Sequence, residues 1–182
     1  MMSKLKDFED VSLYTMEPER RNQLLKTGRE CVVNWATRDG WPVGVMHIYF
    51  WHHERFWVTC TEQRKRVAAL RRSPRSSVVV AFPEEQTITA KTMATVHSGD
   101  GPHADWLYPS LAKRVLQEQP PEVQEQGVPG FVARLASESR VIIELEPVQW
   151  ITFDGRRVKA HAAGDWTPGE PWSEPAPHPV SG

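Results

Sequence analysis

A basic segment, residues 64–66, is the strongest candidate for chemistry in this sequence. It follows Thr59 and Thr61 at the point where an apolar, β-branched run passes into a helix-like pattern. The first N–H groups of a helix and its positive dipole end attract phosphate. Threonine hydroxyls can donate to a phosphate, Arg64 can form two hydrogen bonds with it, and Lys65 adds a charge. A solvated basic helix face would give the same pattern, so both interpretations stand at this point.

The other candidate residues form weaker patterns. His47 lies alone in an apolar run, where a histidine is more often a hydrogen-bonded core residue than a catalytic one. His52, His53 and Cys60 could be grouped with it as metal ligands, but their spacing matches no ligand motif. Cys60 has no evident Asp or Asn partner for nucleophilic chemistry. We therefore predict no metal site and assign no catalytic residue.

Composition limits the class of protein. The chain has 182 residues, 40% of them apolar and 25% charged, which is an ordinary balance for one globular domain. A formal net charge of −1 argues against a polyanion binder and so against a nucleic-acid partner. No apolar run approaches a membrane span, and the N-terminus lacks the apolar part of a signal peptide. With only Cys31 and Cys60 as thiols, we expect a cytoplasmic protein.

The apolar patterning predicts strands that outnumber helices. Short helices are expected at 18–27, 63–72, 104–119 and 131–139, and strands at 31–36, 43–51, 56–61, 76–82, 87–96 and 140–153. Asp39-Gly40 and Asp154-Gly155 are typical of tight turns. Short links between strands favour antiparallel pairing. We therefore predict a mainly β fold, a six-stranded antiparallel split β-barrel with peripheral helices.

The C-terminal residues differ in composition from the rest. Beyond Ala160 the chain has five prolines and three glycines and little apolar periodicity. Such a segment buries too little apolar surface to order itself. We predict a barrel domain at 1–160 and a flexible, Pro-rich tail at 161–182.

An ordered set of short motifs runs through residues 31–82. The motifs are Ala36-Thr37, Asp39-Gly40-Trp41-Pro42, Thr59, Arg64-Lys65, Leu70, Ser73-Pro74-Arg75 and Val78-Val79-Val80. This set resembles the FMN-binding split-barrel superfamily, which includes pyridoxamine 5'-phosphate oxidases and flavin/deazaflavin oxidoreductases. Residues 140–154 are similar to the last strand of that family. No single motif is specific, but their order is.

The resemblance implies a cofactor site. In such proteins the Arg-Lys pair contacts the cofactor phosphate, which implies that role for Arg64 and Lys65. The strand under the flavin ring would run from Val45 to Phe50 and act mainly through its backbone, and His47 could donate to a flavin carbonyl. The implied cofactor-binding residues are Val45, Met46, His47, Val58, Thr59, Thr61, Arg64 and Lys65. The family usually forms homodimers with the cofactor at the interface.

Two departures bear on the reaction. Pyridoxamine 5'-phosphate oxidases carry Arg and Lys on the strand under the ring, and residues 45–50 lack both. The family's Gly-x-Ala in the fifth strand is replaced by residues 91–95, Lys-Thr-Met-Ala-Thr. The expectation is an FMN-dependent or, alternatively, coenzyme F420-dependent oxidoreductase that transfers hydride to a small-molecule substrate. The alternative is a non-catalytic flavin, F420 or haem carrier of the same fold.

Overall fold

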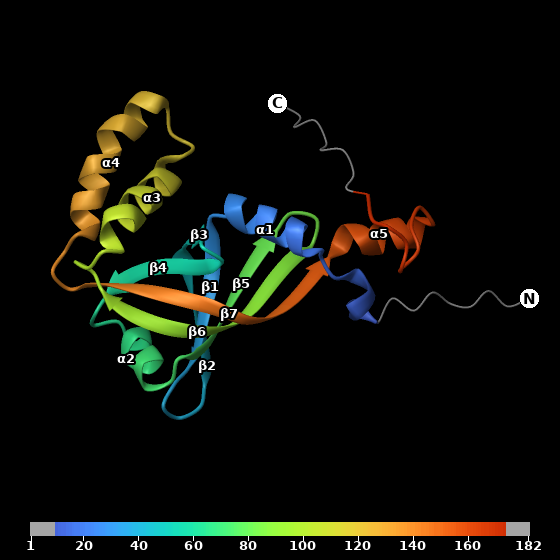
Figure 1. Cartoon of the computed structure of the whole chain (residues 1–182), viewed down its shortest axis with the longest axis horizontal. Coiled ribbons are helices and arrows are strands. Elements are labelled where there is room, and N and C mark those ends of the chain that lie inside the picture. The colour runs from blue at the N-terminus through green and yellow to red at the C-terminus, as the bar shows by residue number, and fades with distance from the viewer. Residues whose placement is uncertain (1–9, 174–182) are drawn as a thin grey trace, which may run out of the picture.

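A single antiparallel sheet forms the centre of the molecule. The computed structural model describes residues 10–173. Seven strands follow the order β2-β1-β5-β6-β7-β4-β3 across the sheet (Figure 1). Their bounds are β1 Glu30–Ala36, β2 Pro42–Ile48, β3 Phe50–His52, β4 Arg55–Thr61, β5 Arg75–Phe82, β6 Gln86–Ser98 and β7 Arg140–Asp154. Each neighbouring pair is antiparallel.

The sheet curls into a barrel because its two edge strands are continuous in the chain. β2 and β3 lie at opposite edges of the sheet, yet only Tyr49 separates them. Tyr49 is fully buried; its backbone N–H donates to Arg29 O (3.1 Å) and its hydroxyl to Leu25 O (2.9 Å). When β2 and β3 are taken as one bent strand, the predicted six-stranded antiparallel split barrel is confirmed.

The barrel interior is filled by alternate residues of the strands. Buried apolar side chains from β1, β4, β5, β6 and β7 meet there, among them Val33, Val58, Val78, Ile88 and Ile143. Such alternation of buried and exposed residues is what a half-buried strand requires. A second, smaller core lies outside the barrel wall and consists of Trp57, Leu107, Tyr108, Leu111, Leu135 and Ile142.

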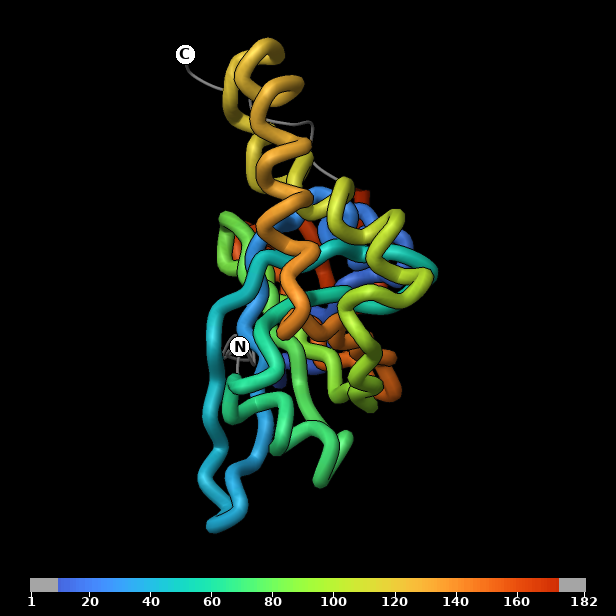
Figure 2. The backbone as a smooth tube through the Cα atoms, turned by 90° about the vertical axis from the view of Figure 1, so that its left-hand side faces the viewer, coloured from blue at the N-terminus to red at the C-terminus, as the bar shows by residue number. Residues whose placement is uncertain are grey.

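Helices cover the ends of the barrel. They are the 3-10 helix η1 Val11–Tyr14, and α1 Pro18–Thr27, α2 Lys65–Arg72, α3 Ala104–Leu116, α4 Pro121–Leu135 and α5 Gly155–Ala163. α3 and α4 form a hairpin between β6 and β7 that stands out from one end of the barrel, whereas α5 lies at the other end (Figures 1 and 2). The second core fixes this hairpin to β4 and β7. Among residues 10–173, no helix is long and apolar enough to cross a membrane.

The helix following Pro120-Pro121 starts earlier than predicted. We expected a helix at 131–139, but α4 begins at Pro121 and ends at Leu135. Proline is favoured at the first position of a helix, because its φ is already helical and its missing N–H needs no partner there. Pro120-Pro121 therefore ends the connection from α3 and also begins α4.

The predicted turn at Asp154-Gly155 is the start of a helix. The Asp154 side chain accepts a hydrogen bond from Arg156 N (3.1 Å), so it caps α5. α5 continues to Ala163, and Trp166 beyond it is buried, with its indole N–H donating to Glu170 O (3.1 Å). These packed residues fall inside the segment predicted as a flexible tail. Residues 174–182 lie outside the described residues, and the domain boundary at 160 stays a prediction.

Candidate functional site

The opening in the barrel lies where β2, which continues into β3, separates from β4. β3 and β4 pair with Phe50 opposite Trp57. Continuing this register past Tyr49 would bring β2 alongside the end of β4. Within the described residues, however, β2 pairs with β1 alone and β4 with β3 and β7. The two strands therefore diverge, and we call the gap between them the split.

A pocket of about 380 Å³ lies along the split. The lips are residues that the extrapolated register would place opposite one another: Met46, His47 and Ile48 of β2, and Thr61, Cys60 and Thr59 of β4. α3 and α4 form an apolar roof with Leu111, Val115, Phe131 and Leu135. Arg64, Arg66 and Arg140 complete the lining. The pocket volume falls within the range of about 300–1,000 Å³ that is usual for small-molecule sites.

The pocket is strongly cationic at one end. Three arginines line it, and the described lining residues include no Asp or Glu. Arg64 is the N-cap residue of α2 and Arg66 lies in its first turn. The Nε of Arg66 is buried and has no hydrogen-bond partner among residues 10–173. An anion would find both guanidinium donors and the free N–H groups of a helix start here.

Two other polar side chains of the lining are already engaged. The Thr59 hydroxyl donates to Val141 O (2.7 Å), so it can only accept from a ligand. Arg140 donates through Nε to Leu135 O (3.2 Å) and thereby holds the C-terminal end of α4. Both therefore help to build the pocket as well as line it.

His47 is held neutral on the β2 lip. Its side chain is 8% exposed, and Nε2 is buried without a hydrogen-bond partner in the described part of the chain. Burial first, and then the positive charge of Arg66, lower the pKa of His47 to about 4. Burial likewise raises the pKa of the Cys60 thiol opposite, which therefore remains protonated at neutral pH. Neither side chain carries a charge in the pocket near pH 7.

The structure brings most of the predicted site residues together. Met46, His47, Thr59, Thr61 and Arg64 all line the pocket. The remaining three do not: Val45 and Val58 pack into the barrel core, and Lys65 is exposed on α2. Ile48 belongs to the strand expected beneath the ring but was not singled out, and Cys60, Arg66, Arg140 and the roof residues were not among the implied cofactor-binding residues.

Only some of the unpredicted residues had a signal in the sequence. Arg66 stands in the basic segment, and Leu111 and Val115 are four residues apart on one helix face. Arg140 is isolated in the sequence from the rest of the site. Among residues 10–173, no group of three His, Cys, Asp or Glu side chains could hold a metal ion.

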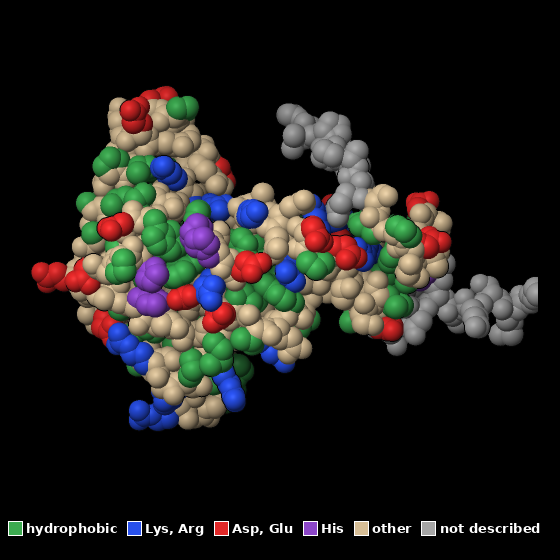
Figure 3. Space-filling view, in the orientation of Figure 1, with side chains coloured by type: hydrophobic (Ala, Val, Ile, Leu, Met, Phe, Trp, Pro, Cys, Tyr) green, Lys and Arg blue, Asp and Glu red, His purple; other side chains and the backbone are tan. Residues whose placement is uncertain are grey.

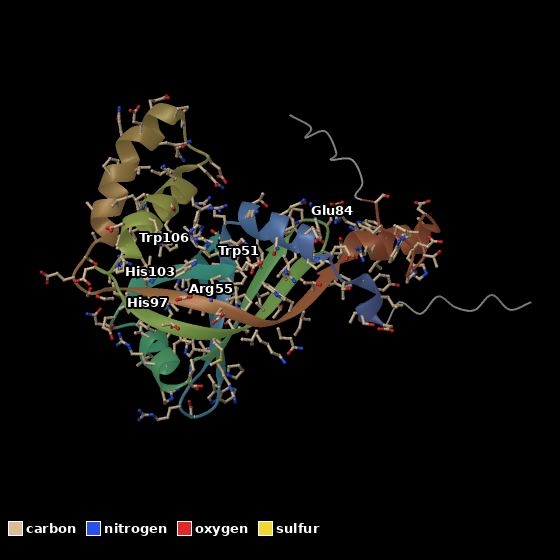
Figure 4. All side chains as sticks on the ribbon, viewed as in Figure 1. Trp51, Arg55, Glu84, His97, His103 and Trp106 are labelled. Atoms are coloured by element: carbon tan, nitrogen blue, oxygen red, sulfur yellow. The ribbon has the colours of Figure 1, made fainter. Side chains whose placement is uncertain are left out.

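A second polar cluster lies on the outer face of β6 and β7, outside the pocket. His97 Nε2 lies 2.8 Å from Glu144 Oε2, and Arg55 forms ion pairs with Glu144 (2.6 Å) and Glu146 (2.9 Å). Figure 4 shows His97 and His103 together near the base of α3, where their ring centroids are 4.6 Å apart, and Figure 3 shows histidine side chains gathered on this face. One Glu144 oxygen pairs with Arg55 and the other with His97, so the cluster connects β7 to its two neighbouring strands, β4 and β6.

Comparison with known proteins identifies the architecture. No protein-family model matches the sequence, and no curated protein matches it. The conserved hypothetical protein Rv2991 from Mycobacterium tuberculosis is 15% identical with a TM-score of 0.66, and the match covers 91% of this chain and 95% of that one.

Two further solved structures match over about three quarters of the chain. An F420 reductase is 18% identical with a TM-score of 0.53, covering 71% of this chain and 94% of that one. A pyridoxamine 5'-phosphate oxidase-related, FMN-binding protein from Nostoc punctiforme is 18% identical with a TM-score of 0.52, covering 75% and 80%. At such identities, the likeness establishes the fold alone.

Proposed function

We propose that this chain, whose fold is that of the pyridoxamine 5'-phosphate oxidase-like split barrels, binds a phosphate-bearing flavin or deazaflavin in the split. The observation that carries the proposal is a pocket with three arginines and no acidic residue at its described lining, opposite an apolar roof. Such a pocket suits a ligand that has an anionic end and a flat, largely apolar end. FMN and coenzyme F420 both meet that description.

The phosphate would bind at the start of α2. Arg64 and Arg66 both line the pocket there, and the first N–H groups of the helix add donors and a positive dipole end. Lys65 is exposed and lies outside the lining, so it would contribute only through its charge. Arg64 and Arg66 would accordingly bind the phosphate, and Lys65 would have a minor role.

The ring would lie between the lips of the split and the helical roof. Leu111 and Phe131 offer apolar surface for a planar ring. The edge of β2 that faces the split has no partner strand in the described chain, which leaves backbone groups for the polar edge of a ring. Val45 and Val58 would act through the backbone alone, because their side chains pack into the core.

The reaction would come from the cofactor. A bound flavin or deazaflavin supplies hydride transfer to or from a small substrate, and the protein supplies binding, orientation and exclusion of water. The titratable side chains His47 and Cys60 are both neutral, so the pocket would present a fixed positive charge only at its arginine end. We assign no catalytic side chain.

Ligand titration tests the cofactor site. FMN, FAD, coenzyme F420 and haem are titrated into the ligand-free protein and followed by absorbance and tryptophan fluorescence. We expect Arg64→Gln and Arg66→Gln each to raise the Kd of FMN or F420 about 10- to 100-fold, the usual effect of losing a charged hydrogen bond. Lys65→Gln removes the same charge outside the pocket and should raise the Kd about threefold or less.

The outcomes separate the alternatives. A wild-type protein that binds neither FMN nor F420, or three glutamine variants with equal effects, would contradict the proposed site. Tight binding of haem, without binding of FMN or F420, would favour the alternative function, a non-catalytic haem carrier of the same fold. Oxidation of a reduced nicotinamide or reduced deazaflavin with a small acceptor would distinguish an oxidoreductase from a non-catalytic flavin-binding protein.

A further inference from the structure

A second cavity lies between the two helices of the α3–α4 hairpin and β3, which lies beside α3 (Figure 1). Its volume is about 620 Å³, within the range of about 300–1,000 Å³ that is usual for small-molecule sites. We call it the hairpin pocket, and its lining includes Phe50, Lys113, Arg114, Glu125, Val128 and Pro129. None of these residues lines the pocket in the split.

The hairpin pocket continues the pocket in the split along one face of α4. Residues spaced four, three and four apart share a helix face, and on α4 they are Gln124, Val128, Phe131 and Leu135. The first two line the hairpin pocket and the last two line the pocket in the split. On the sheet side, Ile48 of the split and Phe50 of the hairpin pocket both pack against the second core. The two pockets are therefore neighbours.

The strand register places the hairpin pocket at the end of the split that is far from the phosphate. The phosphate end lies where β4 leads into α2; there Thr61 pairs with Arg140, whose Nε donates to Leu135 O. Phe50 pairs with Trp57, which is further from α2 along β4. A molecule in the hairpin pocket would therefore lie beside the ring end of the proposed cofactor, where the hydride chemistry takes place.

Most of the lining suits an apolar molecule. Phe50, Val128 and Pro129 supply apolar surface. Two polar side chains of the helices already have partners inside the hairpin. The Ser110 hydroxyl donates to Trp106 O (2.7 Å), and the Gln124 amide donates to Gln119 O (2.7 Å). These groups build the walls, so the body of a ligand would meet mainly carbon atoms.

The charges of the lining favour one acidic group on that molecule. Lys113 and Arg114 of α3 face a single carboxylate, that of Glu125. The Arg114 guanidinium donates to carbonyl oxygens at the end of α1, so its hydrogen bonds are already used. Lys113 is exposed and forms no ion pair among residues 10–173. Lys113 is therefore the cation with donors available to an acidic ligand.

We propose that the hairpin pocket is the substrate site of this protein, and that it binds a small apolar molecule with one acidic group, which Lys113 recognises. The inference rests on the proposed function, because the pocket serves a reaction only when a flavin or deazaflavin occupies the split. It names the class of the small substrate and places that substrate beside the ring, away from the arginines that would bind the phosphate.

Anilinonaphthalene sulfonate is a suitable probe because it is apolar, carries one anionic group and fluoresces on apolar surface. It is titrated into the wild type with and without saturating cofactor, FMN or F420, beside phenylnaphthylamine, which has the same rings without the sulfonate. We expect Val128→Trp, which fills the pocket, to raise the Kd of both probes about tenfold or more. Lys113→Gln should raise the Kd of the sulfonate alone, about threefold.

Two matched controls lie outside the hairpin pocket. Val123→Trp adds the same side chain elsewhere on α4, and Lys91→Gln removes an exposed lysine from β6. Both should leave the Kd of each probe unchanged. The melting temperature of Val128→Trp shows whether its fold is retained, and Lys113→Gln changes only an exposed side chain, so the test does not depend on one variant.

The absorbance spectrum of the bound cofactor tests the position of the site. The probe should shift that spectrum in the wild type and not in Val128→Trp. A bound probe that leaves the spectrum unchanged would overturn the proposal. So would displacement of the probe by the cofactor, an unchanged Kd in a folded Val128→Trp, or equal effects of Lys113→Gln on both probes. If the wild type binds neither FMN nor F420, the proposed function fails; if it binds a cofactor but no probe, only the substrate site fails.

Discussion

At the scale of single residues, the pocket combines side chains whose hydrogen bonds the fold already uses with others that it leaves open. The Thr59 hydroxyl and the Arg140 guanidinium donate to backbone carbonyls and so maintain the walls. His47 Nε2 and Arg66 Nε are buried without partners in the described chain. Residue type alone does not reveal this difference.

The neutral state of His47 gives a pH prediction. Its pKa falls from 6.5 to about 4 on folding, so below pH 6.5 the unfolded chain binds a proton that the native chain does not. Stability should therefore decrease as the pH falls from 6.5 to 4, by up to about 3 kcal/mol from this residue. Urea unfolding of the wild type and of His47→Gln between pH 6.5 and 4 measures the effect as the difference between their free energies of unfolding. Parallel pH profiles for the two proteins would contradict it.

At the scale of elements, local sequence patterns placed the strands well and some helix ends poorly. The alternating runs at 31–36, 56–61 and 76–82 lie within the observed β1, β4 and β5, because a half-buried strand must alternate apolar and polar side chains. Asp154-Gly155 and Pro120-Pro121 were ambiguous, since the residues that make turns also begin helices. α4 packs mainly against α3 and α5 against η1, and these contacts decided between the two.

The cap of α5 can be tested by mutation. Asp154 is 1% exposed and accepts from Arg156 Nη2 (2.6 Å) and from its backbone N–H. We expect Asp154→Ala to destabilise the fold by about 2–3 kcal/mol, because it removes the cap of α5 and the buried charged hydrogen bonds between the Asp154 carboxylate and Arg156. Asp165→Ala, just beyond the same helix and exposed, should change stability by about 0.5 kcal/mol or less. Urea unfolding gives both values, and equal values would show that Asp154 is no special cap.

At the scale of the whole molecule, closure of the sheet leaves apolar side chains exposed near the pocket. Met46 is 59% exposed on the β2 lip, and Trp41 just before β2 is 69% exposed. Lys and Arg side chains gather around the nearby α2 and the β1–β2 hairpin (Figure 3). Exposed apolar groups beside a binding pocket are typical of interaction surfaces. A second copy of the chain over this face would cover Met46 and close the pocket, as the expected homodimer would require.

Light scattering tests the dimer. We expect the wild type to have about twice the chain mass of 20.8 kDa in solution. Trp41→Lys, outside the pocket lining, should shift it toward the monomer and weaken FMN or F420 binding about tenfold, because a charge would have to be buried at the interface. Val123→Lys changes a residue 42% exposed on α4, away from β2, and should alter neither property. A monomeric wild type that binds the cofactor fully would contradict the shared site.

The sequence by itself determined the features that depend on neighbouring residues: the strand pattern, the helix start at the basic segment and the ordered motifs that indicate the fold. The tertiary structure decided which side chains share the split. Helix geometry buries Val67 and Leu70 of α2, leaves Lys65 exposed and directs Arg66 to the pocket. Arg140 and the helical roof come from distant segments, and only the tertiary structure shows that His47 Nε2 has no hydrogen-bond partner among residues 10–173. The local sequence therefore indicated the candidate phosphate site, whereas the pocket itself forms only in the closed barrel.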